Sequence, residues 1–178
     1  MHPAEPQNEP LQCFDEQGNP TEVRTRAEVK QEPPRWWYGT ARVWLVNDQG
    51  QLMVSKRAEG LSGNPGKWQT YFGGHVGAGT THKKTAQREL EEEAGVQRPI
   101  EDFFFVSKGH NEEKKVFFEN YAVRFNGQPS DLHFTDHEVT EAKWMGMDEY
   151  WADKEKNPDM WCNSCNPEQQ KIIRRWLD

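Results

Sequence analysis

A short run of carboxylates is the part of this chain best suited to chemistry. Residues 88–96 read Arg-Glu-Leu-Glu-Glu-Glu-Ala-Gly-Val. Because helix neighbours are three and four residues apart, Glu89, Glu92 and Glu93 would share one edge of a helix. Like charges at that spacing destabilise a helix by about 0.2–0.5 kcal/mol per pair, and a hard divalent cation would relieve the repulsion. The spacing therefore predicts a Mg²⁺ or Mn²⁺ site, and a solvated acidic helix face is the alternative.

The helix that would carry these carboxylates has recognisable ends. Thr80 or Thr81 can cap its N-terminus, because either hydroxyl can accept a hydrogen bond from a free backbone N–H. Gly95 suits the left-handed residue that commonly ends a helix. A glycine-rich turn over residues 72–79 precedes the helix and lets the backbone approach a ligand closely. A narrow apolar stripe recurs every four residues at Ala86, Leu90 and Ala94. One face of the helix should therefore pack on a core while the adjacent edge carries the carboxylates.

This turn and helix together resemble the Nudix hydrolase family. The family's box reads G-x5-E-x7-R-E-U-x-E-E-x-G-U, where U is a bulky aliphatic residue, and it would cover residues 74–96 here. The matching positions are Gly74, Arg88, Glu89, Leu90, Glu92, Glu93, Gly95 and Val96. Thr80 stands where the first Glu of the box is expected. The resemblance therefore implies an intact metal-binding triplet with a less firmly braced loop, and a domain that binds without catalysis is the alternative.

Weaker matches resemble the isopentenyl-diphosphate-isomerase-like branch of the family. They cover most of residues 11–145 and include 14–20, 26–29, 43–46, 56–57, 65–68, 74–76, 138–139 and Trp144. An isomerase of this branch needs a cysteine before the Gly-His pair and histidine ligands upstream. Gly73 occupies the cysteine position, and residues 28–38 contain no His. Hydrolysis is therefore favoured over isomerisation, which stays the less favoured alternative.

The resemblance implies metal-assisted hydrolysis of a diphosphate linkage. Glu89, Glu92 and Glu93 would hold Mg²⁺ or Mn²⁺ together with the Gly73 carbonyl, and the cation would lower the pKa of bound water. Glu92, Glu93 and Arg88 are the catalytic candidates. Among them Arg88 would orient the glutamates rather than touch the substrate.

Other residues could bind the substrate or accept a proton. The candidates for substrate binding are Lys56, Arg57, Gly74 and His75. Surface charge is the alternative for the two cations, and a histidine satisfied by backbone is the alternative for the imidazole. The candidates for a base on another loop are Glu112, Glu113 and Glu119. An exposed charge is the better interpretation of any one of these three, because the sequence does not choose among them.

Length and charge agree with an enzyme that acts on small molecules. The chain has 178 residues, a size typical of one domain. Its net charge of −7 gives little support for binding duplex nucleic acid. The sequence has no long apolar run and no N-terminal signal pattern. We therefore expect a cytoplasmic protein with a small-molecule diphosphate as its partner and no membrane association, and a homodimer is compatible with the sequence.

The order of elements predicts an α+β fold, an α/β/α sandwich with a mixed central sheet and a catalytic loop-helix. A flexible N-terminus is expected over residues 1–10, and a single domain over 11–178. That domain would begin with a strand extension over 11–34 and end with a helix over 167–177. The predicted strands are 11–15, 36–46, 52–56, 103–106, 116–118 with 121–123, and 142–145. A turn at residues 47–50 predicts a hairpin between the second and third of these.

Cysteine is sparse. Cys162 and Cys165 form a C-x-x-C pair, which could be half of a zinc site or a redox pair. No second such pair exists, so we favour free or structural thiols. The third cysteine, Cys13, leaves an odd count, which argues against a secreted disulfide framework.

Overall fold

The computed structural model describes residues 6–61, 63–134, 138–162 and 165–178. Its centre is β3 (Trp37–Val46), a strand that is almost entirely buried. β3 pairs in parallel with β8 (Val116–Arg124) from Tyr38 to Val46, and antiparallel with β6 (Phe72–His75) from Thr40 to Val43. Parallel and antiparallel neighbours therefore meet on one strand, which makes the sheet mixed, as predicted.

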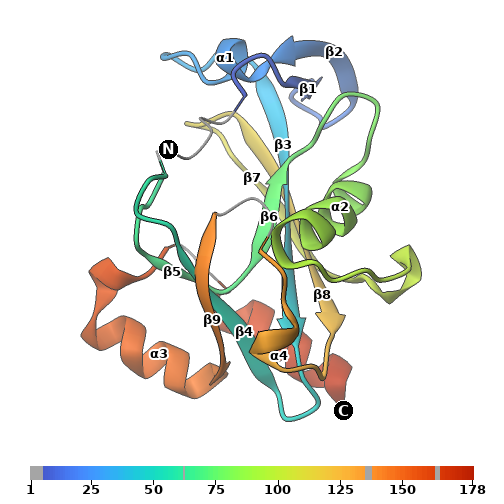
Figure 1. Cartoon of the computed structure of the whole chain (residues 1–178). Helices are drawn as coiled ribbons and strands as arrows, with labels where there is room; N and C mark the ends of the chain where they lie inside the picture. The colour runs from blue at the N-terminus through green and yellow to red at the C-terminus, as the bar shows by residue number, and fades with distance from the viewer. Residues whose placement is uncertain (1–5, 62, 135–137, 163–164) are drawn as a thin grey trace.

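The remaining strands extend this sheet on both sides. They are β1 (Pro10–Phe14), β2 (Pro20–Thr25), β4 (Gln51–Arg57), β5 (Trp68–Gln69), β7 (Phe104–Asn111) and β9 (Val139–Gly146). β3 and β4 are joined by a tight turn but pair only at Val46 and Leu52, because β4 continues beside β9 and β5 instead. The predicted hairpin at residues 47–50 is therefore confirmed, with its antiparallel pairing limited to the residues next to the turn. β6 lies beside the part of β3 that β4 leaves free (Figure 1).

Helices cover both faces of the sheet. The α-helices are α1 (Arg26–Val29), α2 (His82–Ala94), α3 (Met147–Lys156) and α4 (Pro167–Leu177), and short 3-10 turns cover Ile100–Asp102, Pro129–Asp131 and Pro158–Met160. α2 packs on one face through Ala86, Leu90 and Ala94, which share a core with alternate residues of β3. α3 and α4 belong to a second core on the opposite face, around Trp44 and Ile173 (Figure 1). The predicted α/β/α sandwich is confirmed.

Several element boundaries differ from the sequence-based expectation. The strand expected at 103–106 runs on to Asn111, and the two segments 116–118 and 121–123 form the single strand β8. Within the expected strand extension 11–34, residues 22–29 divide into the end of β2 and the short helix α1. Each boundary depends on pairing with a distant strand or on a local cap, which short-range periodicity does not report.

The ends of α2 follow the capping rules. The Thr81 hydroxyl accepts a hydrogen bond from the Lys84 N–H at 3.3 Å, and Gly95 ends the helix with a φ of 69° in the left-handed region. Of the two threonines that could cap the helix, Thr81 is therefore the one that does so.

Replacing Thr81 with Ala should lower the free energy of unfolding by about 0.5–2 kcal/mol, because a first-turn N–H loses its acceptor. Urea denaturation of the purified variant measures this loss. Thr80→Ala is the control, since the cap is on its neighbour, and it should cost less. An equal loss in both variants would contradict the assignment of the cap.

Candidate active site

The turn between β6 and α2 brings two glutamates of α2 against strand β6. The Gly73 N–H donates a hydrogen bond to Glu93 Oε2 at 3.0 Å, and Glu93 is only 7% exposed. A Cβ atom added to Gly74 would lie 2.5 Å from the Glu89 carboxylate. The carboxylate of Glu89 therefore occupies the space that a side chain at position 74 would fill, and any larger residue there would displace it.

Arg88 links the carboxylates along this edge of α2. Its Nη2 lies 2.6 Å from Glu89 Oε1, and its Nε lies 3.9 Å from Glu92 Oε2. Burial raises the pKa of the Glu89 carboxyl to about 7, against the opposing effect of the Arg88 guanidinium. Glu92 stays 57% exposed at the side-chain level. Along this edge, Glu89 is therefore desolvated, Glu93 is buried and hydrogen-bonded, and Glu92 is accessible to solvent.

The donors on this edge suit a hard divalent cation by their chemistry. Glu89, Glu92 and Glu93 all offer carboxylate oxygens, and burial disfavours the ionised form of Glu89, which a bound cation would stabilise. In the described part of the chain, however, no three carboxylate, imidazole or thiol groups already converge on one point. A cation would therefore have to draw the carboxylates together, chiefly by moving the exposed Glu92.

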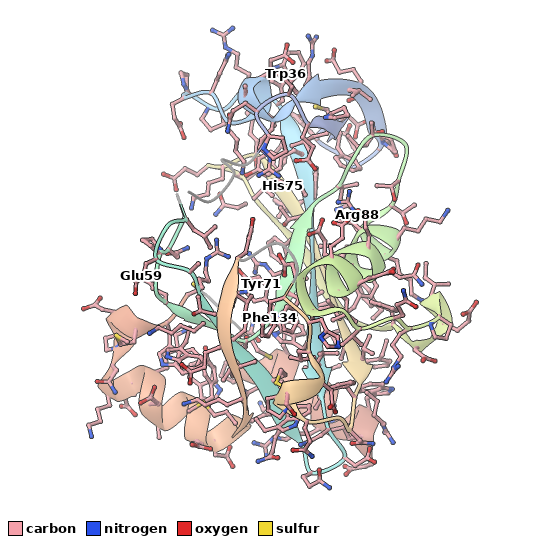
Figure 2. All side chains as sticks on the ribbon, viewed as in Figure 1. Trp36, Glu59, Tyr71, His75, Arg88 and Phe134 are labelled. Carbon is pink, nitrogen blue, oxygen red and sulfur yellow. The ribbon has the colours of Figure 1, made fainter. Side chains whose placement is uncertain are left out.

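The two cations predicted to bind substrate lie at the end of β4. Arg57 donates from Nε to the Gly63 carbonyl at 2.9 Å and from Nη1 to Gln69 Oε1 at 3.2 Å. These bonds fix the guanidinium beside the loop that follows β4. Lys56 is half-buried on the same strand. Figure 2 labels Glu59 on this loop and Tyr71 just before β6, with β9 drawn between the two labels.

His75 does not share the surroundings of the carboxylates. Its ring lies 5.5 Å from that of Tyr38, a residue of β3. Burial lowers the pKa of His75 to about 3, and the positive charges of Lys30 and Arg26 act in the same direction. The imidazole is therefore neutral at neutral pH and supplies no positive charge to a phosphate.

The three acidic residues predicted as alternative bases separate in the structure. Glu112 and Glu113 lie exposed in the turn between β7 and β8, and Glu112 lies 3.2 Å from His110. Glu119 is half-buried on β8, where it accepts a hydrogen bond from the Tyr121 hydroxyl. Its charge also acts on His82 in the first turn of α2. Of the three, Glu119 is thus the one oriented toward the helix of the carboxylates.

One acidic residue near the site was not singled out from the sequence. The Glu9 carboxylate accepts a hydrogen bond from Arg26 Nε at 2.9 Å and raises the pKa of Glu89. Glu9 falls in the polar segment 1–10, where no periodicity marks a functional position. Glu9 is held near Glu89 by its ion pair with Arg26, a residue 17 positions further along the chain.

The N-terminal strand braces the loop that carries Thr80. The Gln12 N–H donates to the Val76 carbonyl at 2.9 Å, and the Ala78 N–H donates to the Pro10 carbonyl at 3.0 Å. The side chain of Gln12 is buried, and its Oε1 accepts a weaker bond from the Gly79 N–H at 3.4 Å. β1 therefore supplies hydrogen bonds to the loop from outside the box.

Replacing Gln12 with Ala should lower the free energy of unfolding by about 1–3 kcal/mol, because buried polar partners lose their bonds. The amide of Gly79 should also exchange its hydrogen faster, since the loop loses one attachment. Hydrogen exchange read by NMR measures the second effect. Gln31→Ala, at an exposed position, should leave both quantities unchanged. Unchanged exchange at Gly79 in the Gln12 variant would contradict the brace.

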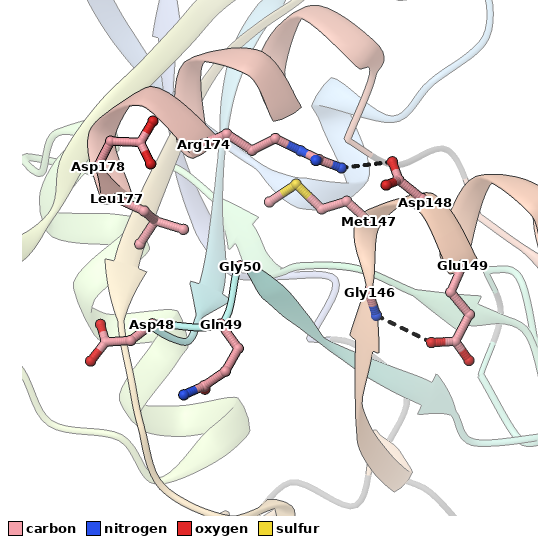
Figure 3. A pocket seen from close by; sticks show the side chains of 10 residues that line it. All are labelled: Asp48, Gln49, Gly50, Gly146, Met147, Asp148, Glu149, Arg174, Leu177 and Asp178. Atoms are coloured by element: carbon pink, nitrogen blue, oxygen red, sulfur yellow. Dashed lines mark hydrogen bonds and ion pairs between the residues drawn. The ribbon is translucent and has the colours of Figure 1, made fainter.

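A hollow lies at the opposite end of β4 from Arg57. It is lined by the turn between β3 and β4 and by the facing ends of α3 and α4 (Figure 3). Arg174 pairs with Asp148 at 2.7 Å across it, and the Gly146 N–H donates to Glu149 at 3.3 Å. The Arg174 guanidinium is thus already paired with a carboxylate of the same hollow, and we assign no chemistry to it.

A model of the Nudix domain matches residues 38–162. The chain belongs to the Nudix domain family. An uncharacterized Nudix hydrolase of Pseudomonas aeruginosa is 29% identical over 182 residues, covering 99% of this chain and 98% of that protein. An isopentenyl-diphosphate Delta-isomerase of Brevibacterium linens is 30% identical over 146 residues, covering 76% of this chain and 75% of that protein. The predicted likeness to the isomerase-like branch is therefore confirmed.

Other relatives match over shorter spans. Nudix hydrolase 3 of Arabidopsis thaliana is 36% identical over 45% of this chain, but the chain spans only 10% of that protein. The chain spans 64% of an uncharacterized Nudix hydrolase of Listeria monocytogenes. Among solved structures, DR0079 from Deinococcus radiodurans has a TM-score of 0.71 at 20% identity, covering 94% of this chain and 98% of that one. This last likeness shows that the two proteins share a fold.

Proposed function

We propose that this protein is a Mg²⁺-dependent hydrolase that cleaves a diphosphate linkage in a nucleoside diphosphate derivative or a related organic pyrophosphate. The observation that carries the proposal is the pair of α2 carboxylates packed against β6. Glu89 fills the space above Gly74, and Glu93 accepts a bond from Gly73. Burying a carboxylate costs free energy unless the charge is compensated, and a bound cation would compensate both of these.

The residues have distinct roles in this proposal. Glu89, Glu92 and Glu93 would hold Mg²⁺ or Mn²⁺ with the Gly73 carbonyl. When bound, the cation would neutralise phosphate charge and lower the pKa of a bound water. Arg88 would keep Glu89 and Glu92 in register, as its two contacts indicate.

Proton transfer and substrate binding need further groups. Glu92 is the accessible carboxylate of the edge, so it suits a base that accepts the proton of the attacking water. Arg57 and Lys56, at the end of β4, would bind the phosphate oxygens that the metal does not hold. The fixed guanidinium of Arg57 favours this role, because its position is already set by two hydrogen bonds.

Isomerisation is the second candidate, because an isopentenyl-diphosphate Delta-isomerase is among the relatives. Its requirement for a thiol beside the Gly-His pair is not met, since position 73 is glycine. The three cysteines of the chain, Cys13, Cys162 and Cys165, are buried at other places in the fold. Hydrolysis is therefore the better interpretation of this site.

A substrate panel with and without Mg²⁺ tests the proposal. It would contain nucleoside di- and triphosphates, nucleotide sugars, dinucleotides, prenyl diphosphates and isopentenyl diphosphate, with the products identified by mass spectrometry. Metal-dependent release of phosphate or of a nucleoside monophosphate would support the hydrolase. A double-bond shift without phosphate release would identify an isomerase. Binding without turnover, seen as a raised melting temperature, would identify a binding domain.

A further inference from the structure

Arg42 on β3 is a charged side chain that the roles above leave unexplained. It is half-buried, and it lies in register with Gly73 of β6 on one side and Asn120 of β8 on the other. Its guanidinium lies 4.8 Å from the ring centre of Tyr71 and 5.9 Å from that of Phe118. Two aromatic faces from two neighbouring strands thus hold the cation.

In the part of the chain that the structure describes, no carboxylate pairs with this cation. Among the described residues, no ion pair or side-chain hydrogen bond involves Arg42, although other half-buried arginines such as Arg24 and Arg26 pair with glutamates. Charges away from water are usually paired, and a guanidinium carries five N–H donors in a rigid fork. The five donors of Arg42 are therefore available to an anion that enters from solvent.

Tyr71 places this cation near the proposed active site. Burial raises the pKa of the Tyr71 hydroxyl. The charges of Arg42 and Arg57 act to lower this pKa, and the charge of Glu93 acts to raise it. Tyr71 precedes β6, between that strand and β9 (Figure 2). Arg42 is also paired in register with Gly73, whose N–H binds Glu93. A ligand held between Glu93 and Arg57 would thus lie within electrostatic range of Tyr71, the residue whose ring Arg42 contacts.

We propose that Arg42 binds a second anionic group of the substrate, a phosphate or carboxylate other than the diphosphate that is cleaved. The inference rests on the proposed function, since it extends the same site. Arginine suits this role because its planar fork matches a carboxylate or a phosphate with two parallel hydrogen bonds. The two aromatic rings restrict the guanidinium before the ligand arrives, which lowers the entropy lost on binding.

Two matched pairs of ligands distinguish a phosphate from a carboxylate as the group that Arg42 binds. ATP differs from ADP by one phosphate, and UDP-glucuronate differs from UDP-glucose by one carboxylate. Calorimetry with Ca²⁺ as the divalent cation would measure the affinity of all four for the unchanged protein, for Arg42→Gln and for Arg42→Lys. Arg98→Gln is the matched control, because Arg98 is also half-buried beside a ring, that of Phe125 at 5.8 Å, but lies past the C-terminus of α2.

In one of the two pairs, Arg42→Gln should weaken the more anionic ligand by about 10-fold or more, the value of one charge-assisted hydrogen bond. The other member of that pair should change by less than about threefold. Arg42→Lys should restore part of the preference, because it keeps the charge but loses the fork. Arg98→Gln should leave the ratio of the two affinities unchanged in each pair of ligands. Comparing two ligands on one sample also removes any effect of incomplete folding.

Unchanged ratios within both pairs would overturn the inference, and so would failure of all four ligands to bind the unchanged protein. Turnover with Mg²⁺, measured on the same samples, reports the proposed function separately. Binding that discriminates through Arg42 without turnover would support the anion site and contradict the hydrolase. Turnover by samples whose affinity ratios do not depend on Arg42 would support the hydrolase and contradict the anion site.

Discussion

Replacing Glu93 with Gln should lower kcat/KM for Mg²⁺-dependent diphosphate hydrolysis by at least about 100-fold, because losing even a residue that supports a metal ligand costs 10- to 100-fold. Gln keeps the size of the side chain and can still accept the hydrogen bond from the Gly73 N–H, so the local fold should be retained. The loss should therefore come from the missing negative charge. Initial rates over a range of Mg²⁺ concentrations measure it.

Glu91→Gln is the control for that variant. Glu91 lies on the same helix but is exposed and accepts a hydrogen bond from Gln97. Its replacement removes the same charge from α2 outside the proposed site, and the rate should stay within about twofold, as for a surface change. If both variants lose activity alike, the effect belongs to the overall charge of the helix, and the role of Glu93 is contradicted.

Replacing Gly73 with Ala should damage both stability and activity. An added Cβ would lie 2.1 Å from the Ala41 carbonyl oxygen, a backbone atom that cannot rotate away. β6 must then separate from β3, at a cost of about 1–3 kcal/mol or more in the free energy of unfolding. The Gly73 N–H would move away from Glu93, and a shift of about 1 Å at a reacting site can cost 100-fold in rate. Denaturation and kinetics on one preparation measure both effects.

Gly63→Ala is the matched control, because nothing lies within 4 Å of a Cβ added there. It should leave stability and rate close to those of the unchanged chain. If Gly73→Ala loses stability but keeps its full rate with Mg²⁺, the alignment of β6 and Glu93 is not needed for the reaction.

The helix of the carboxylates was the most predictable part of the molecule. Its start at a threonine, its end at Gly95 and its buried stripe all follow from rules that act within a few residues. The opposition of Glu89 to Gly74 has the same local origin, since the turn and the helix are adjacent in the chain. These elements could therefore be derived before any pairing of strands was known.

The surroundings of that helix could not be derived in the same way. The parallel pairing of β3 with β8 joins segments more than seventy residues apart, and no local pattern specifies it. Arg42 lies within a long apolar strand, where the sequence gives no reason to single it out. Its aromatic partners, Tyr71 and Phe118, come from two other parts of the chain. The brace by β1 and the position of Glu9 likewise depend on contacts between distant residues.

Hydrolysis in H₂¹⁸O with Mg²⁺ tests the central claim most directly, using the member of the substrate panel that is turned over fastest. The account predicts one ¹⁸O atom in a phosphate product for each linkage cleaved, no reaction in EDTA, and near-complete loss of the label in Glu93→Gln. Turnover that leaves phosphate unlabelled, a rate that EDTA does not change, or no cleavage of any panel member would contradict it.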